Sequence, residues 1–259
     1  MWRVLKNRIK QGYRTSRYPK EAPVFPPRFR GKPTIDFHQL QKLSPSLPSP
    51  QDPTGALNIS PQPAVDLGKL LFNEDLKEVA SPSVLGYSQD HRMAVSHRED
   101  LVLKDNELKL ASGLKEKMKK VLGRSLKLRE VCAGSCGGCD LEIQALDNVV
   151  FDLSRFGIQF VASPRHADGL IVTGMVTKNM ESALQAAYEA TPFPKIVIAV
   201  GACAISGGIF CGSPQVHSGV DRLLPVDLYI PGCPPHPLTI LDGLLRLLDK
   251  IDTPDKKKS

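Results

Sequence analysis

Four of the six cysteines lie in three short turns that are rich in glycine or proline. Each of these turns follows a segment whose sequence predicts a β-strand. The predicted strands cover residues 125–131, 196–200 and 226–230, and the turns after them read Gly134-Ser135-Cys136-Gly137-Gly138-Cys139, Gly201-Ala202-Cys203 and Pro231-Gly232-Cys233-Pro234-Pro235. The carboxyl ends of parallel strands meet at one edge of a sheet, so separate segments would bring their thiols to the same rim. The fold must therefore allow three distant turns to meet.

The second half of the chain alternates between strand-like and helix-like periodicity. Strands are expected at residues 125–131, 158–162, 169–172, 196–200 and 226–230, and helices at 114–122, 141–156, 180–190 and 238–248. The strands are largely continuous Val and Ile runs, as expected when helices cover both faces of a sheet. This pattern predicts an α/β fold, a doubly wound, flavodoxin-like domain with a parallel sheet that carries the cysteines.

The cysteines favour a metal group over disulfides. The chain begins without a recognisable secretory signal, so a reducing compartment is expected. Four converging thiolates in turns of small residues suit an iron-sulfur cubane, whose sulfides need backbone N–H donors close by. Zinc or buried thiols are the alternatives, because Cys-x-x-Cys spacing alone also occurs in zinc and thioredoxin-like sites. The cubane interpretation predicts an electron carrier.

The positive charge is concentrated at the amino terminus. The net charge is +7, and residues 1–32 contain ten Lys or Arg and one acid, so this arm carries +9 and the remaining residues sum to −2. Within the arm, Trp2, Leu5 and Ile9 recur at helical spacing between cations, as in a helix that lies on an anionic membrane surface. A solvated or partner-bound arm is the alternative. Nucleic-acid binding is not expected, since one short patch has no recognised reading motif behind it.

Composition divides the chain into three parts. Residues 1–32 form the basic amphipathic arm, residues 33–112 a proline-rich domain, and residues 113–259 the α/β domain. Dense prolines between Tyr18 and Pro63 exclude long helices there. No stretch approaches the roughly 20 apolar residues needed to cross a bilayer, so a soluble or peripheral protein is expected.

Residues 130–249 resemble the small-subunit family shared by membrane-bound, energy-converting nickel-iron hydrogenases, formate hydrogenlyase and the cluster N2 subunit of respiratory complex I. The motifs that carry the resemblance are Gly134-Ser135-Cys136-Gly137-Gly138-Cys139-Asp140, Ala162-Ser163-Pro164-Arg165-His166-Ala167-Asp168, Thr173-Gly174-Met175-Val176-Thr177, Gly201-Ala202-Cys203-Ala204, Gly219-Val220-Asp221-Arg222 with Pro225-Val226-Asp227, and Ile230-Pro231-Gly232-Cys233-Pro234-Pro235. The resemblance implies that Cys136, Cys139, Cys203 and Cys233 ligate one 4Fe-4S cluster. It also implies that catalysis belongs to a partner, so no catalytic residue is expected in this chain.

The first motif separates the branches of this family. Complex I subunits carry two adjacent cysteines there, whereas Gly137 and Gly138 stand between Cys136 and Cys139, the form seen in hydrogenases. The resemblance therefore implies a cluster proximal to a nickel-iron large subunit, with ferredoxin-like and membrane subunits as further partners and a peripheral location on the cytoplasmic side of the cell membrane. A complex I-like subunit that passes electrons to quinone, or a structural scaffold without redox function, are the alternatives.

Two cysteines remain outside this ligand set. A fifth thiolate cannot join a filled cubane, so Cys132 is not expected to be a ligand. It is expected to be a buried bystander, with a ligand exchange as the alternative. Cys211 is also expected to be a small buried residue.

Three further polar residues are candidates for tuning or proton transfer. Arg165 and His166 could set the potential of the cluster, or Arg165 could pair with Asp168 while His166 lies on the surface. Glu142 could relay protons at the partner interface, or simply be a carboxylate favoured by a helix amino terminus.

The first hundred residues resemble, more faintly, a two-cluster ferredoxin subunit. The matching segments are Ser16-Arg17-Tyr18-Pro19, Phe29-Arg30-Gly31-Lys32-Pro33 and Asp52-Pro53-Thr54-Gly55-Ala56-Leu57, and the positions Leu70, Asn73, Leu76 and Ala80 keep a ferredoxin cysteine spacing. None of these positions is a cysteine. The resemblance implies a degenerate ferredoxin-like domain without iron, and a proline-rich extension of unrelated origin is the alternative.

Overall fold

A five-stranded parallel sheet forms the centre of the molecule. The structure, a computed structural model, describes residues 2–42, 52–59, 62–74, 84–114 and 125–251. The strands are β6 (Leu126–Cys132), β7 (Ile158–Phe160), β8 (Gly169–Thr173), β9 (Ile196–Val200) and β10 (Leu228–Ile230), in the order β10-β9-β8-β6-β7. Numbered along the chain, this is the flavodoxin-like order 2-1-3-4-5. The predicted doubly wound α/β fold is confirmed.

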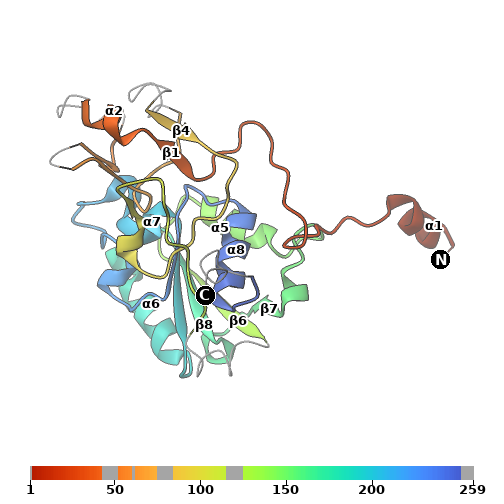
Figure 1. Cartoon of the computed structure of the whole chain (residues 1–259). Helices are drawn as coiled ribbons and strands as arrows, with labels where there is room; N and C mark the ends of the chain where they lie inside the picture. The colour runs from red at the N-terminus through yellow and green to blue at the C-terminus, as the bar shows by residue number, and fades with distance from the viewer. Residues whose placement is uncertain (1, 43–51, 60–61, 75–83, 115–124, 252–259) are drawn as a thin grey trace.

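Helices cover both faces of this sheet (Figure 1). On one face lie α5 (Gly138–Ala145) and α8 (Pro237–Leu247), which share a buried cluster with the strands. On the other face lie α6 (Lys178–Ala190) and α7 (Gly201–Ser206), which contribute to a second cluster. All residues of β8 and β9 are buried. The two helical layers explain why these strands are apolar on both sides.

The longest predicted helix is shorter than expected. Instead of covering residues 141–156, α5 ends at Ala145, and a separate 3-10 helix follows at Leu153–Phe156. Beyond the helix, Asn148 Oδ1 accepts the backbone N–H groups of Val150 and Phe151 at 2.8 and 3.1 Å. This local turn competes with helix continuation.

The amino-terminal half forms small antiparallel sheets that pack on the face of α6 and α7. One sheet pairs β1 (Pro33–Ile35) with β4 (Leu85–Tyr87), and the other has the order β2 (Leu57–Asn58), β3 (Ala64–Asp66), β5 (Val102–Leu103). Helix α2 (Phe37–Lys42) and a 3-10 helix at Arg98–Leu101 complete this half. One buried cluster runs from Ile35 and Leu103 to Ile205 and Leu224, so the core is continuous across residue 112.

Amino-terminal segments also cover helix α8 and the free edge of β10. Every residue of α8 is buried. The Tyr18 hydroxyl donates to Asp242 Oδ1 at 2.7 Å, and Arg246 Nε donates to Asp242 Oδ2 at the same distance. At the edge strand, Val95 and Tyr229 exchange both backbone hydrogen bonds. These contacts bind the two halves of the chain together.

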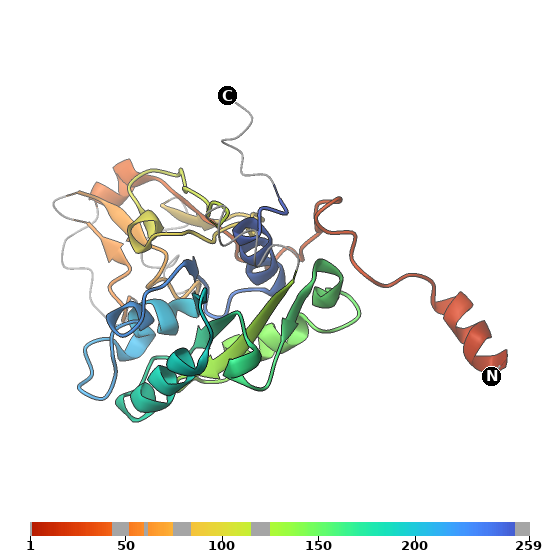
Figure 2. The ribbon, with the colours of Figure 1, turned by 90° about the horizontal axis from the view of Figure 1, so that it is seen from below.

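Helix α1 (Trp2–Gln11) stands away from the body of the protein at the end of an extended segment, as the two perpendicular views in Figures 1 and 2 show. None of its residues is buried, and Trp2 and Ile9 expose 79% and 75% of their surface. The helical periodicity of this arm is confirmed. Among the described residues, no helix is both long and apolar enough to cross a membrane.

Several sequence expectations fall partly outside the described residues. The predicted helix at residues 114–122 lies almost entirely outside the described residues. Leu76 and Ala80 of the ferredoxin-like spacing also lie outside them. In the described part, Leu70 is fully buried. Asp52 stands where the resemblance places a cysteine, and its carboxylate accepts the backbone N–H groups of Ala56 and Leu57 at 3.0 and 2.8 Å. The carboxylate thus organises a turn, and the ferredoxin-like origin of residues 33–112 stays a prediction.

Candidate metal centre

The three cysteine-bearing segments leave the carboxyl ends of neighbouring strands. Cys136 lies in the turn after β6, and Cys139 lies in the first turn of α5. Cys203 follows β9 in the first turn of α7, and Cys233 follows β10. Between β6 and β8 the order of strands reverses, and such a switch point opens a crevice at the strand ends. The Cys136 turn lies at this point.

Backbone hydrogen bonds fix the turns against one another. Ala133 N–H donates to the carbonyl of Thr173 at 2.8 Å, and Met175 N–H donates to that of Gly134 at 2.9 Å, which ties the turn after β6 to the end of β8. Ala202 N–H donates to the carbonyl of Gly232 at 2.9 Å, which ties the amino terminus of α7 to the Cys233 turn. The thiols are therefore carried on rigid turns.

Glycines make room for the thiols. At Gly201, with φ +88°, an added Cβ would lie 2.5 Å from Cys139 Sγ and 3.5 Å from the carbonyl oxygen of Gly232. At Gly208 it would lie 2.7 Å from Cys203 Sγ. A side chain at either position would occupy the place of a sulfur atom. The sulfur of Cys139 thus lies against the turn that carries Cys203, beside the turn that carries Cys233.

The four thiols lie within electrostatic reach of one another. Burial raises the pKa of Cys139, and repulsion from the charges of Cys203, Cys233 and Cys136 raises it further. Burial likewise raises the pKa of Cys203 to about 11, with Cys233 and Cys136 as the next causes, and raises that of Cys233 with Cys136 as the second cause. Four adjacent thiolates at neutral pH need compensating positive charge, which a metal group provides.

The donor set fits an iron-sulfur cubane. Each iron of a cubane takes one thiolate, and four cysteines supply all four. The first turns of α5 and α7 add backbone N–H groups that the helices leave without an intrahelical partner, which suit sulfide acceptors. Among the described residues, no three His, Cys, Asp or Glu side chains converge closely enough to hold a single metal ion. A cubane does not require such convergence. When bound, it would accept and release single electrons.

A partly buried network of hydroxyls and a carboxylate supports the Cys136 turn. Its residues lie in the motifs quoted for the family resemblance, but their contacts were not predicted from sequence. Asp140 Oδ2 accepts from Ser135 Oγ and Asp140 Oδ1 from Thr173 Oγ1, both at 2.5 Å. Ser135 Oγ in turn accepts the N–H of Gly137 at 3.0 Å. Although burial acts to raise the pKa of Asp140, these hydrogen bonds outweigh it and lower the pKa. The carboxylate therefore stays ionised and connects the turn to the end of β8.

Glu130 faces this network from β6. Burial, followed by the charge of Asp140, raises the pKa of Glu130 to about 7. The raised pKa favours the protonated form of Glu130, which lessens its repulsion from the carboxylate of Asp140.

The two remaining cysteines are not buried, so that expectation is wrong. Cys132 is exposed because β7 pairs only with residues 126–128 of β6, which leaves the end of β6 open on that side. Its Sγ lies 3.2 Å from Ser135 Oγ. Cys211 is exposed in the surface segment that follows the 3-10 helix Gly208–Phe210.

Arg165 and His166 lie at the beginning of β8, whereas the cysteine turns lie beyond the opposite ends of the strands. Both side chains are exposed. The carboxylate of Asp168 accepts the backbone N–H of Lys127 at 2.7 Å, a bond to the start of β6. The five-residue length of β8, about 16 Å at 3.3 Å per residue, separates these residues from the rim. This position does not support their role in tuning the cluster.

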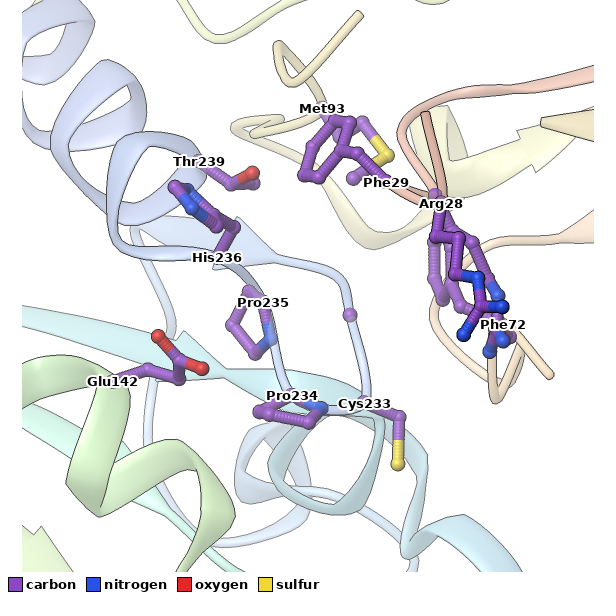
Figure 3. Close-up of a pocket in the computed structure, with 12 residues that line it drawn as sticks. Arg28, Phe29, Phe72, Met93, Glu142, Cys233, Pro234, Pro235, His236 and Thr239 are labelled. Atoms are coloured by element: carbon purple, nitrogen blue, oxygen red, sulfur yellow. The ribbon is translucent and has the colours of Figure 1, made fainter. Parts of the chain in front are cut away.

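Glu142 lines a cavity of about 270 Å³ beside Cys233 (Figure 3). Burial raises the pKa of Glu142. His236 and Thr239 line the same cavity from the amino terminus of α8, and Phe29 and Arg28 line it from the amino-terminal segment. Sequence reasoning did not single out His236, although Pro237 after it is a signal for a helix start.

Comparison with known proteins identifies the family. The sequence profile described as "NADH ubiquinone oxidoreductase, 20 Kd subunit" matches residues 136–247. A protein of Pyrococcus furiosus described as a probable membrane-bound hydrogenase subunit is 48% identical over 132 residues, which are 51% of this chain and 79% of that protein. The chain belongs to this 20 kDa-subunit family. The family resemblance inferred from the cysteine motifs is confirmed.

Relatives in this 20 kDa-subunit family come from both branches. Formate hydrogenlyase subunit 7 of Escherichia coli is 45% identical over 54% of this chain and 55% of its own length. An NADH-quinone oxidoreductase subunit of Citrifermentans bemidjiense is 53% identical over 44% of this chain and 66% of its own length. The family members are thus subunits of oxidoreductase complexes. The matched segments cover about half of this chain, and less than two thirds of these two relatives.

A solved structure of the archaeal membrane-bound sulfane sulfur reductase contains a similar chain. The two are 34% identical over 52% of this chain and 75% of that chain, with a TM-score of 0.46.

Proposed function

We propose that this protein is the electron-transfer subunit of a membrane-associated, hydrogenase-like complex and binds one 4Fe-4S cluster through Cys136, Cys139, Cys203 and Cys233. The observation that carries the proposal is the meeting of four thiols from three separate strand ends, with Gly201 leaving the space beside Cys139. Electron transfer needs no side-chain acid or base. The chain's part is ligation, partial burial and N–H donation, which together set the potential.

The ligand spacing supports the choice of partner. The two glycines between Cys136 and Cys139 favour a nickel-iron large subunit, next to whose active site the cluster would lie. Leu141, directly after the ligand turn, exposes 67% of its surface and offers an apolar contact to such a partner. Ferredoxin-like and membrane subunits of the same complex would supply and receive the electrons.

Electron paramagnetic resonance on the reduced complex tests the cluster. Single Cys→Ser changes at positions 136, 139, 203 and 233 should each abolish or alter the 4Fe-4S signal of this subunit and lower the iron content. Cys211→Ser, at an exposed cysteine outside the set, is the matched control and should leave both unchanged. A folded complex with zinc in place of iron, or with no cluster signal from this subunit, would contradict the proposal and favour a zinc module or a scaffold.

A complex I-like role is the second candidate, because subunits of NADH-quinone oxidoreductase are among the relatives. In that role the same cluster would donate electrons to quinone. The large subunit of the complex decides between the two functions. Four nickel-ligating cysteines there, together with reduction of the cluster under hydrogen, would support the hydrogenase role. Their absence, together with oxidation of the cluster by added quinone, would support the complex I-like role.

Helix α1 supports a peripheral position at the cytoplasmic membrane surface. Trp2, Leu5 and Ile9 are exposed on one side of the helix, and Arg3, Lys6, Arg8 and Lys10 accompany them. Because Trp2 is the only tryptophan, its fluorescence in the full chain reports directly on insertion. Anionic vesicles should shift the emission to the blue, whereas zwitterionic vesicles should not. Ile9→Ser should weaken this blue shift. Val4→Ser changes an exposed apolar residue outside the face formed by Trp2, Leu5 and Ile9, and should not weaken it. Equal effects of the two changes would contradict membrane binding through this face.

A further inference from the structure

Aromatic rings of the amino-terminal segment enclose His236, which follows the turn that carries Cys233. His236 lies three residues after Cys233 and caps α8, where its Nδ1 accepts the N–H of Leu238 at 3.1 Å. Phe25 and Phe29 meet the imidazole edge to face, with centroids at 5.2 and 5.5 Å and planes at 81° and 84°. Phe151 adds a third such contact at 6.0 Å. The ring of His236 is thus enclosed on several sides.

The imidazole is suited to this enclosure because it is neutral. Burial lowers the pKa of His236 to about 4, and the nearby His91 lowers it in the same direction. With Nδ1 accepting a hydrogen bond, the neutral tautomer carries its hydrogen on Nε2. A neutral ring can pack among phenyl rings without the cost of a buried charge.

The two phenylalanines are anchored to the body of the protein. Their rings stack on each other at 3.9 Å with planes 13° apart. Phe25 also contacts His91 at 5.4 Å, and His91 contacts Tyr18 at the same distance. The Tyr18 hydroxyl donates to the buried carboxylate of Asp242 in α8. An aromatic path therefore leads from the middle of α8 back to the ligand turn at its start.

The Cys233 turn has little other freedom. Gly232 has φ +148°, and an added Cβ there would lie 2.5 Å from Cα of Pro235, so the turn closes tightly on itself. Pro234, Pro235 and His236 connect the ligand directly to α8, and Phe29 lines the cavity that Cys233 borders (Figure 3). Displacement of His236 would be transmitted to Cys233.

We propose that Phe25 and Phe29 form an aromatic clamp that positions the Cys233 ligand through His236 and limits the access of water to the cluster. This inference rests on the proposed cluster and extends it to residues outside the segment that matches the family, which begins at residue 136. In this proposal the function of the amino-terminal segment is to hold the Cys233 turn in place through His236. Phe25, Phe29 and His236 are positioning residues and do not touch the reacting atoms.

Removal of the two phenylalanine rings should shift the reduction potential of the cluster in a predictable direction. Reduction makes the cluster and its thiolates more negative by one charge, and water stabilises the more highly charged form. The Phe25→Ala/Phe29→Ala variant should therefore raise the reduction potential in the assembled complex. We expect a shift of about 30–60 mV, which corresponds to roughly a three- to tenfold change in the ratio of reduced to oxidised cluster. Loss of iron to a chelator should accelerate as well.

The matched control is Val24→Ala, in the same segment, at a side chain that exposes 97% of its surface. It should leave the potential and the chelation rate at wild-type values. The conservative changes Phe25→Leu and Phe29→Leu keep apolar volume and should retain most of the wild-type behaviour. If the double alanine variant does not assemble, His236→Asn carries the test. His236→Asn keeps a side-chain acceptor for Leu238 N–H but not the ring, and should behave like the double alanine variant.

Failure of the clamp and failure of the cluster assignment give different results. A wild-type complex without a signal that depends on Cys233 would overturn the cluster itself. In the other case the cluster gives a normal signal, while the double variant and His236→Asn have the same reduction potential and chelation rate as Val24→Ala. This result would overturn only the clamp. Hydrogen exchange at residues 232–238 of the full chain gives a readout independent of the cluster, and should speed up when the rings are removed.

Discussion

Gly201 occupies the point where the three cysteine-bearing turns meet. An alanine there would place its Cβ 2.5 Å from Cys139 Sγ, in a backbone conformation that costs about 1–3 kcal/mol for a residue with a side chain. Gly201→Ala should therefore remove most of the iron from the complex, measured as iron per subunit. Gly212→Ala is the matched control, because Gly212 has φ +83° but no atom within 4 Å of an added Cβ. Equal iron loss in both variants would show that backbone strain alone is responsible.

The carboxylate of Asp140 acts on the opposite side of the site. Asp140→Asn removes the negative charge and one of the two acceptor oxygens, so the two charge-assisted bonds from Ser135 and Thr173 cannot be kept. A hydrogen bond to a charged group contributes about 1.5–3 kcal/mol, and we expect a decrease of this size in the free energy of unfolding of the full chain, measured by urea denaturation. Asp147→Asn, at an exposed carboxylate, should cost less than about 0.5 kcal/mol. A neutral Asp140→Asn variant would contradict the role of this network.

Among the helices of the described residues, α8 is the one in which every residue is buried. Gly243 lies in its interior, where alanine would ordinarily stabilise a helix by about 0.5–1 kcal/mol. Here the added Cβ would lie 2.8 Å from the Cβ of Ala94. Gly243→Ala should therefore destabilise the full chain in urea denaturation. The double variant with Ala94→Gly should recover part of the loss, and additive effects of the two changes would contradict direct packing between them.

The strands of the sheet could be predicted from sequence because their apolar runs are local signals. β9 agrees with its predicted range, and β8 is one residue longer than predicted. The extent of α5 could not be predicted, since the turn at Asn148 depends on side-chain hydrogen bonds. The six-residue α7 was missed because a glycine-rich start reads as a turn.

In the candidate site, too, features set by neighbouring residues in the sequence could be predicted, and features set by distant residues could not. The four candidate ligands could be proposed from sequence because each cysteine lies in a recognisable turn, and their ligand role stays a prediction. The exposure of Cys132 depends on the shortness of β7, and the contact of Phe25 with His236 joins residues far apart in sequence. No periodicity in either segment carries that information.

At the scale of the whole molecule, the junction between the amino-terminal segment and α8 should be sensitive to acid. Burial lowers the pKa of both His91 and His236, the latter to about 4. The unfolded chain, with histidine pKa values near 6.5, therefore binds protons first as the pH falls. Stability is fully present above about pH 6.5 and is lost progressively towards pH 4.

Urea denaturation of the full chain between pH 7 and 5.5 measures this loss. We expect His236 alone to contribute about 1 kcal/mol of it by pH 5.5. His236→Asn, which keeps the cap but cannot be protonated, should show a shallower dependence on pH. Identical slopes in the two proteins would mean that His236 does not titrate differently in the folded and unfolded chain.

Truncation tests how far the two halves depend on each other. Removal of residues 1–112 would expose α8 and the edge of β10 at once, and an uncovered apolar edge strand promotes aggregation. We expect the remaining chain not to co-purify with its complex. Removal of residues 1–11, which contribute no buried side chain in the described part of the arm, is the control and should preserve assembly. Assembly of the shorter chain would show that the α/β half folds alone.

The continuous core has an implication for how such a protein can change in evolution. The segment that matches the family profile ends at residue 247, yet the last helix in it packs in one cluster with Tyr18, Ala94 and Ala111, which lie before that segment begins. The segment that matches the profile is therefore shorter than the unit that shares one hydrophobic core. Substitutions in the amino-terminal half are then constrained by the helix and edge strand that this half covers, and a domain boundary drawn from sequence similarity alone would cut through the hydrophobic interior.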